Sequence, residues 1–220
     1  PKDLIIKMPR GNSFYHYIKT KEQDAAWTSY FDFGARNIRL SAIIQLGFGF
    51  LKGFFFDQMR NNRGLGYIVE SRLDFFEHVL GISFTVVSNK VHASKISKEA
   101  GIVFNDFIDY ILKLSDEDLE RSRASLIASV SKQNRTIEEW MTDVVLTSVV
   151  NGDPDYATKL CEHISKITKE ELCDVFSQNL CGENRTSINV YADTEFDEKE
   201  VSGIAIVDPK SYKNSSNVYQ

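Results

Sequence analysis

The feature that most constrains how this chain can fold is the junction at residues 58–69, Gln-Met-Arg-Asn-Asn-Arg-Gly-Leu-Gly-Tyr-Ile-Val. Before it, apolar side chains recur every three or four residues from about Asn37 to Asn62, which predicts a helix with one buried face. From Leu65 the period changes to two, which predicts a strand. Gly64 lies between the two patterns and can adopt the positive φ that commonly ends a helix. The predicted inner face of the helix consists of Leu40, Ile43, Ile44, Gly47, Phe48, Leu51, Phe54, Phe55 and Met59.

The rest of the chain predicts an α+β fold. Runs with a period of two, or short apolar runs, indicate strands at 14–20, 25–33, 65–75, 80–86 and 187–192. Helical periodicity indicates further helices at 94–114, 115–134, 136–150, 156–164 and 168–180. Neighbouring strands joined as hairpins, with the helices grouped separately, predict a largely antiparallel sheet packed against helices.

Several of these helices carry a recognisable start signal. Ser115, Thr136 and Thr168 each stand three residues before an acidic residue, which is the pattern of a capping box. Ser94 is the predicted cap of the helix at 94–114. The three capping boxes are independent of one another, so they fix the predicted starts of three helices.

The composition changes after Asp193. The segment that follows is charged around Glu195 to Glu200, and it is polar from Lys210 to the end. Polar segments with few apolar residues bury little surface and tend to be poorly ordered. We therefore expect a single α+β domain at 1–193 and a loosely held tail at 194–220.

Composition also excludes several kinds of partner. The net charge is −5 and no long basic block occurs, which argues against nucleic acid. The apolar run at 40–56 contains Gln45 and Lys52 and is shorter than the roughly 20 residues of a membrane span, so we expect a buried helix and no membrane partner. Three widely spaced cysteines form no disulfide framework, and no secretory signal is recognisable. These features predict a reducing, cytoplasmic setting.

The chain contains no complete catalytic or metal motif. A zinc peptidase places two histidines and a glutamate on one helix, but no two of the four histidines here lie within five positions of each other. Cys161, His163, Cys173 and Cys181 lack the paired Cys-x-x-Cys spacing, and residues two apart on a helix point in different directions. No nucleophile elbow or phosphate loop occurs. The sequence thus predicts no catalytic residue, metal site or cofactor in this segment.

The junction has a structural interpretation that needs no ligand. Arg60 and Arg63 would complement the negative end of the helix dipole, Gly64 would end the helix, and Tyr67 would be an ordinary strand residue. A resemblance points further. Arg60 and Tyr67, within Arg-x-x-x-x-Leu-Gly-Tyr-Ile-Val, resemble the C-terminal half of the insulinase-type (pitrilysin-family) zinc metallopeptidases. The order of elements from about Gly11 to Asp193 is similar to that family's non-catalytic domain.

The resemblance implies a role for the whole segment. Members of this family have two halves of two α+β domains each, and the zinc motif lies in the first domain. The fourth domain lacks the motif but supplies an Arg and a Tyr, here Arg60 and Tyr67, that contact the substrate backbone. We therefore expect the C-terminal substrate-chamber domain of a zinc metalloendopeptidase, inactive alone. Its expected partners are a peptide and a zinc-bearing N-terminal catalytic half.

A second branch of proteins with this fold leaves an alternative function open. Arg-Gly-Leu-x-Tyr at 63–67 is also similar to the mitochondrial-processing-peptidase branch, which shares the fold. The alternative function is a non-enzymatic scaffold or core subunit that makes protein–protein contacts. A homodimer, the substrate and the cleavage preference are left open by the sequence.

Overall fold

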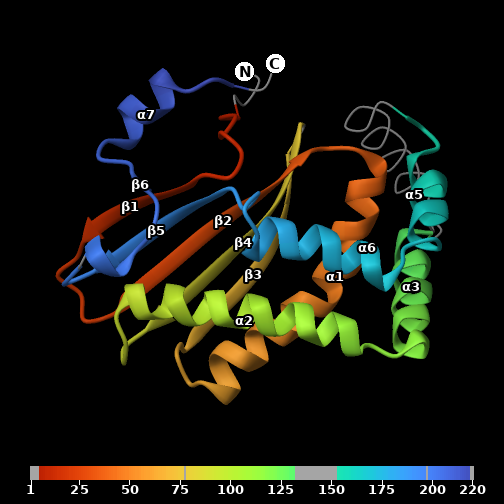
Figure 1. Cartoon of the computed structure of the whole chain (residues 1–220), viewed down its shortest axis with the longest axis horizontal. Helices are drawn as coiled ribbons and strands as arrows, with labels where there is room; N and C mark the ends of the chain where they lie inside the picture. The colour runs from red at the N-terminus through yellow and green to blue at the C-terminus, as the bar shows by residue number, and fades with distance from the viewer. Residues whose placement is uncertain (1–4, 77, 132–152, 197, 219–220) are drawn as a thin grey trace, which may run out of the picture.

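The computed structural model describes residues 5–76, 78–131, 153–196 and 198–218, which form one sheet with helices packed against it (Figure 1). The strands are β1 (Ser13–Lys19), β2 (Ala25–Ala35), β3 (Ile68–Phe75), β4 (Val79–Ser88), β5 (Ser187–Asp193) and β6 (Ile204–Ala205). The helices are α1 (Ile38–Phe56), α2 (Ala93–Lys113), α3 (Asp116–Val130), α5 (Tyr156–Ile164), α6 (Lys169–Phe176) and α7 (Pro209–Ser215). Short π and 3-10 segments are η1 (Asp57–Asn62), η2 (Ser177–Cys181) and η3 (Glu198–Glu200). The predicted α+β fold is confirmed.

The sheet has the strand order β3-β4-β2-β5-β1-β6 and is mixed. The predicted hairpin between β3 and β4 is confirmed, and β4 and β5 each pair antiparallel with β2. The predicted hairpin between β1 and β2 is wrong, because β5 lies between them and pairs parallel with β1. A polar contact supports the pairing of β5 with β2, because Asn189 of β5 accepts a hydrogen bond from the buried Trp27 indole of β2 at 3.2 Å. That indole donor would otherwise be buried without a partner.

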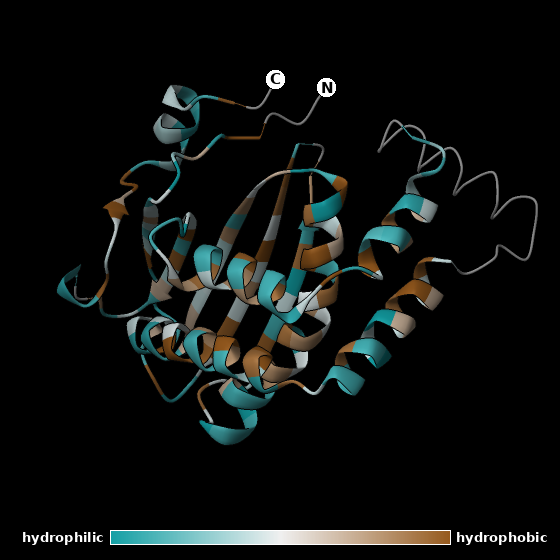
Figure 2. Ribbon diagram, turned by 45° about the vertical axis from the view of Figure 1, so that its right-hand side comes forward, coloured by the Kyte–Doolittle hydropathy of each residue, from teal (hydrophilic) through white to brown (hydrophobic). Residues whose placement is uncertain are grey.

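Helix α1 crosses one face of the sheet with its apolar side inward. Figure 2 shows hydrophobic residues concentrated where the helices meet the sheet and hydrophilic residues on the outward turns. Phe55 is fully buried, and its ring centroid lies 4.6 Å from that of Phe84 in β4 and 5.7 Å from that of Phe104 in α2. Aromatic rings at these distances contribute packing energy beyond the area that they bury. The predicted inner face of α1 is therefore largely confirmed, and Ala42 and Leu46 are added to it.

Within the described residues, the stretch Ile38–Asn62 has the length and apolar composition of a membrane-spanning helix. About half of its apolar window, 44%, is buried inside the fold. The core helix of a folded domain meets the same criterion, and the contacts of Phe55 show that α1 has that role here.

Two of the predicted helix starts are confirmed. The Ser115 hydroxyl accepts a hydrogen bond from the Asp118 N–H, and Thr168 forms a full capping box with Glu171. The predicted start at Thr136, with its helix at 136–150, lies outside the described residues.

Ser94 is not the cap of α2, contrary to prediction. The helix begins at Ala93, whose N–H donates to the carboxylate of Asp193 at 2.8 Å. The Ser94 hydroxyl instead donates to Glu200 at 2.6 Å. The carboxylate at the start of α2 comes from the end of β5, a hundred residues away, so no local sequence pattern predicts it.

Residues after Asp193 differ from the loosely held tail that we expected. β6 adds a sixth strand by pairing parallel with Phe14 and Tyr15 of β1. The ring of Tyr212 in α7 lies 5.4 Å from that of Phe14, and Val218 forms a bridge with Ile6. The described residues near the two ends, Ile6 and Val218, therefore lie side by side, and a handful of apolar residues hold a segment that is polar overall (Figure 1).

Candidate functional site

The junction between α1 and β3 is a π turn followed by a tight reversal. In η1 the hydrogen bonds span five residues, as in the bond from the Arg63 N–H to the Gln58 carbonyl at 3.1 Å. Gly64 has a φ of +59°, which confirms the predicted left-handed glycine. The Leu65 N–H then donates to the Met59 carbonyl at 2.9 Å, and both of these side chains are buried. The inner side of the turn is thus fixed by backbone hydrogen bonds and by packing.

Gly66 is required by the close approach of β4. A Cβ atom at this position would lie 2.6 Å from a methyl group of Val86 and 3.0 Å from the Val87 carbonyl oxygen. The missing side chain lets the Tyr67 N–H reach that same carbonyl at 3.0 Å. The Leu-Gly-Tyr sequence therefore has a structural cause that is independent of any ligand.

Arg63 belongs to the inner side of the turn. Its guanidinium donates to Glu99 at 2.6 Å and to Asp106 at 2.8 Å, and both carboxylates are on α2. Only a quarter of the Arg63 side chain is exposed. This pair of bonds joins the end of α1 to α2, which leaves Arg63 with a structural function.

Arg60 lies on the outer side of the same turn and is exposed. Its guanidinium donates to the backbone carbonyl of Tyr67 and stands 5.6 Å from the centroid of the Phe56 ring. A guanidinium has five N–H donors, and this is its only hydrogen bond within the described part of the chain. Arg60 therefore spans the reversal and also keeps donors that face solvent.

Tyr67 is 43% exposed and immediately precedes β3. Its hydroxyl donates to the Asp24 carboxylate at 2.6 Å. This hydrogen bond to a carboxylate raises the pKa of Tyr67 above its ordinary value, so the side chain remains a neutral phenol at pH 7. No local sequence pattern points to Asp24, because the residue belongs to the turn before β2 and reaches Tyr67 only in the folded chain.

A groove of about 700 Å³ runs between α1 and β3. Gly49 and Gly53 line its helix side, and a Cβ atom at either position would meet no atom within 4 Å. Val69 and Ser71 line its other side, on the strand that forms one edge of the sheet. Phe56, on which Arg60 stacks, also lines the groove. The exposed Arg60 thus adjoins a groove with an open helix face and a sheet edge.

The described residues contain no group of three or more His, Cys, Asp or Glu side chains arranged to hold a metal ion. The cysteines considered above are free thiols, and burial raises the pKa of Cys173 and raises that of Cys181 to about 11. Neutral thiols are poor metal ligands, because the thiolate is the form that binds. The absence of zinc from this segment stays a prediction, which metal analysis tests.

Comparison with known proteins gives one consistent relationship. The family described as PQQ synthase PqqF-like, C-terminal lobe domain 4, matches residues 49–145. A Schizosaccharomyces pombe protein named as a zinc protease, mug138, is 23% identical over 207 residues, which covers 91% of this chain and 21% of that protein.

Solved structures share the fold at lower identity. The crystal structure of pitrilysin has a TM-score of 0.82 at 15% identity, covering all of this chain and 24% of that one. The inactive domain of an M16 peptidase from Pseudomonas fluorescens has a TM-score of 0.66 at 14% identity, covering 87% of this chain and 45% of that one. The chain thus spans about a fifth of the length of the zinc protease relative and a quarter of pitrilysin.

Proposed function

On the combined evidence of sequence and fold, the chain is an insulinase-type C-terminal domain, and from this premise we propose that it forms a substrate-binding wall of a zinc metalloendopeptidase. The observation that carries the proposal is that Arg60 and Tyr67 are both exposed at this turn, where the Arg60 guanidinium donates to the Tyr67 carbonyl and stacks on Phe56, which lines the groove between α1 and β3. In this proposal the segment holds no zinc and no catalytic residue of its own. The metal would lie in an N-terminal half, where it polarises the peptide carbonyl.

The chemistry of the pair suits a peptide backbone. The remaining N–H donors of Arg60 form a planar fork that can bind carbonyl oxygens or an oxyanion. A donor aimed at a developing oxyanion typically contributes about 2.7–4 kcal/mol of transition-state stabilisation in acyl-transfer sites. Tyr67 donates its hydrogen to Asp24, so its oxygen can accept from a peptide N–H, and it can donate to a carbonyl only by exchanging that partner.

The alternative is a non-enzymatic scaffold of the processing-peptidase type. The exposed pair would then be a part of a protein–protein interface, or a device that only closes the turn. The bond from Arg60 to the Tyr67 carbonyl favours a contribution to the turn, but it uses one of five donors. Free thiols agree with our proposal of a cytoplasmic, reducing setting for either function.

Photo-crosslinking distinguishes these functions. Tyr67 is replaced by p-benzoylphenylalanine in the full-length protein, and a peptide substrate is added. We expect crosslinks from position 67 to the peptide. The matched control is the same replacement at Tyr110, which lies on α2 and has a similar exposure of 37%. Crosslinks to another protein chain, and none to peptide, would favour the scaffold.

Metal analysis tests the proposal that this segment holds no zinc and no catalytic residue of its own. Purified alone, the 220-residue chain should contain no stoichiometric zinc and should cleave no peptide, because the described residues lack a ligand set. One tightly held zinc ion per chain, measured by elemental analysis, would contradict it.

A further inference from the structure

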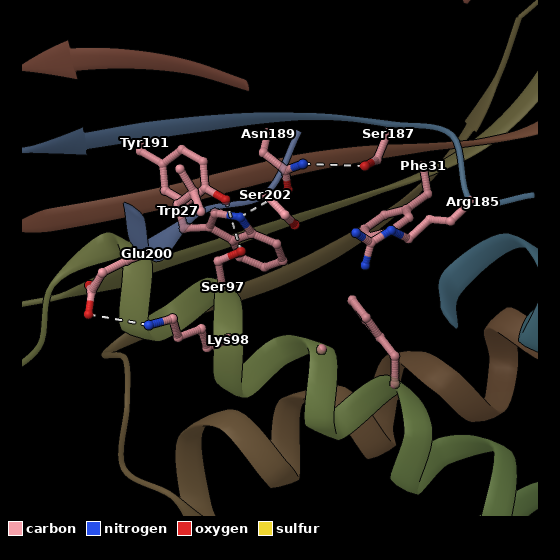
Figure 3. A pocket seen from close by; sticks show the side chains of 13 residues that line it. Trp27, Phe31, Ser97, Lys98, Arg185, Ser187, Asn189, Tyr191, Glu200 and Ser202 are labelled. Atoms are coloured by element: carbon pink, nitrogen blue, oxygen red, sulfur yellow. Dashed lines mark hydrogen bonds and ion pairs between the residues drawn. The ribbon is translucent and has the colours of Figure 1, made fainter. Parts of the chain in front are cut away.

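A second cavity lies between the sheet and α2, and neither Arg60 nor Tyr67 lines it. It has a volume of about 120 Å³, and side chains of β2, β5 and α2 and the segment at 200–202 line it (Figure 3). A water molecule occupies about 30 Å³ in the liquid, so the cavity has room for about four waters or a ligand of similar size. Because the segment 200–202 forms one wall, the cavity admits only short ligands.

Arg185 supplies an uncompensated positive charge to this cavity. Figure 3 shows its guanidinium pointing into the cavity from the loop before β5. No described residue accepts a hydrogen bond from this guanidinium or forms an ion pair with it. The nearby Glu200 does not neutralise it, because the Glu200 carboxylate is bound by Ser94 at 2.6 Å and by Lys98 at 3.2 Å. Since Lys98 and Glu200 compensate each other, the charge of Arg185 remains.

Two hydroxyl groups face Arg185 across the cavity. The oxygens of Ser97 and Tyr191 are 3.0 Å apart and share one hydrogen bond, in which either can donate. The pair has two hydroxyl hydrogens and uses one between them, so one hydrogen remains for a ligand. Burial raises the pKa of Tyr191, which keeps this phenol protonated.

Other polar groups around the cavity are already engaged or are buried without a partner. The amide nitrogen of Asn189 donates to the Phe14 carbonyl and to Ser187, both at 3.3 Å. Ser29 is opposite Asn189 in the register of β2 and β5, and its fully buried hydroxyl has no partner within the described part of the chain. Buried hydroxyls are nearly always hydrogen-bonded, so an unpartnered one opposite a residue that lines the cavity is unusual.

The remaining walls are apolar. Trp27, Phe31 and Phe104 line the cavity, and each is at most 3% exposed. A ligand that fits must therefore carry a negative charge at one end and a small apolar body at the other. A guanidinium fork matches the two oxygens of a carboxylate in its plane.

We propose that this cavity binds the carboxylate of a small free organic acid, with Arg185 as its ion-pair partner and the Ser97–Tyr191 pair as its hydroxyl donor. Trp27, Phe31 and Phe104 enclose the short apolar body. The proposal does not depend on Arg60, on Tyr67 or on peptidase activity, and it can be tested on the 220-residue chain itself.

The test uses the Trp27 indole N–H as a reporter in two-dimensional NMR spectra, because this ring lines the cavity. Sodium acetate is titrated into the 220-residue chain, and sodium chloride keeps the ionic strength constant. Acetamide serves as the uncharged isostere of acetate. We expect a saturable shift of the Trp27 resonance with acetate and none with acetamide. A linear shift, or an equal response to acetamide, would overturn the proposal.

Variants of the chain then test whether acetate binds in this cavity. Arg185→Gln should weaken acetate binding at least about tenfold, since it removes the charge-assisted bonds. Arg121→Gln removes the same charge from the exposed surface of α3 and should leave binding unchanged. Tyr191→Phe should weaken binding less than Arg185→Gln, and it remains informative if Arg185→Gln fails to fold. Acetate binding unaffected by both cavity variants would overturn the assignment, and tighter binding of inorganic phosphate would overturn the choice of a carboxylate.

Discussion

The two sides of the turn at 57–67 contain the same kinds of residue in opposite circumstances. Arg63 faces α2, is three-quarters buried and is bound by two carboxylates. Arg60, three residues earlier, is exposed and stacks on Phe56, and its one hydrogen bond to a described residue is to the Tyr67 carbonyl. Residue type therefore does not distinguish a structural arginine from a candidate ligand-binding arginine. The difference lies in how many of the guanidinium donors are already used within the fold.

This contrast separates two kinds of effect. Changes on the inner side should lower the free energy of unfolding, because packed and paired groups are lost there. Changes on the outer side should leave stability nearly constant and alter only the binding of a ligand. The predictions below test that separation, starting with the largest expected loss of stability.

Phe55→Ala should cost about 3–5 kcal/mol in the free energy of unfolding, the usual range for a buried phenylalanine. The ring is fully buried between Phe84 and Phe104. The adjacent Phe56 is 38% exposed, so Phe56→Ala is a matched control that should cost much less. Urea denaturation of both variants gives the comparison, and similar losses would mean that the inner and outer faces of α1 do not differ as described.

Arg63→Gln should cost about 1 kcal/mol, because it removes two partly buried ion pairs and leaves Glu99 and Asp106 without their partner. Arg60→Gln is the control on the outer side, and its effect should stay within about 0.5 kcal/mol. A double-mutant cycle with Glu99→Gln isolates the pair energy. If Arg60→Gln were as destabilising as Arg63→Gln, the contrast between the two arginines would fail.

The smallest expected effect concerns the titration of Tyr67. The hydrogen bond to Asp24 raises the pKa of Tyr67, so Asp24→Asn should return it toward the ordinary value of about 10. Because the folded-state pKa lies above the unfolded value, this group's contribution to stability is present below pH of about 10 and is lost as the pH rises through the folded pKa. Ultraviolet difference titration against Tyr67→Phe measures the shift, and equal curves for wild type and Asp24→Asn would exclude the interaction in solution.

The sequence predicted the local parts of this structure well. The inner face of α1 follows from a helical period that Ile44, Leu51 and Phe55 share, and Gly64 follows from the change of period after it. The starts at Ser115 and Thr168 were predictable because each cap lies within four residues of its partner.

The long-range parts could not be predicted in this way. The insertion of β5 between β1 and β2, and the carboxylate of Asp193 at the start of α2, join residues a hundred or more positions apart. Asp24 contacts Tyr67 across 43 residues for the same reason. The cavity around Arg185 also combines residues from distant strands, so its spacing in the sequence carries no signal. The role of Arg60 and Tyr67 in binding substrate stays a prediction.

That role is tested most directly by steady-state kinetics of Tyr67→Phe and Arg60→Lys in the zinc-loaded, full-length protein. The first change removes one hydroxyl, and the second keeps the charge but loses the planar fork. If the two residues contact the peptide in the transition state, each change should lower kcat and kcat/KM together, by about 10- to 100-fold, with the free energy of unfolding within about 0.5 kcal/mol of wild type. Unchanged kinetics for both variants in a stable, zinc-loaded protein would contradict the proposal and leave the pair as a device that closes the turn.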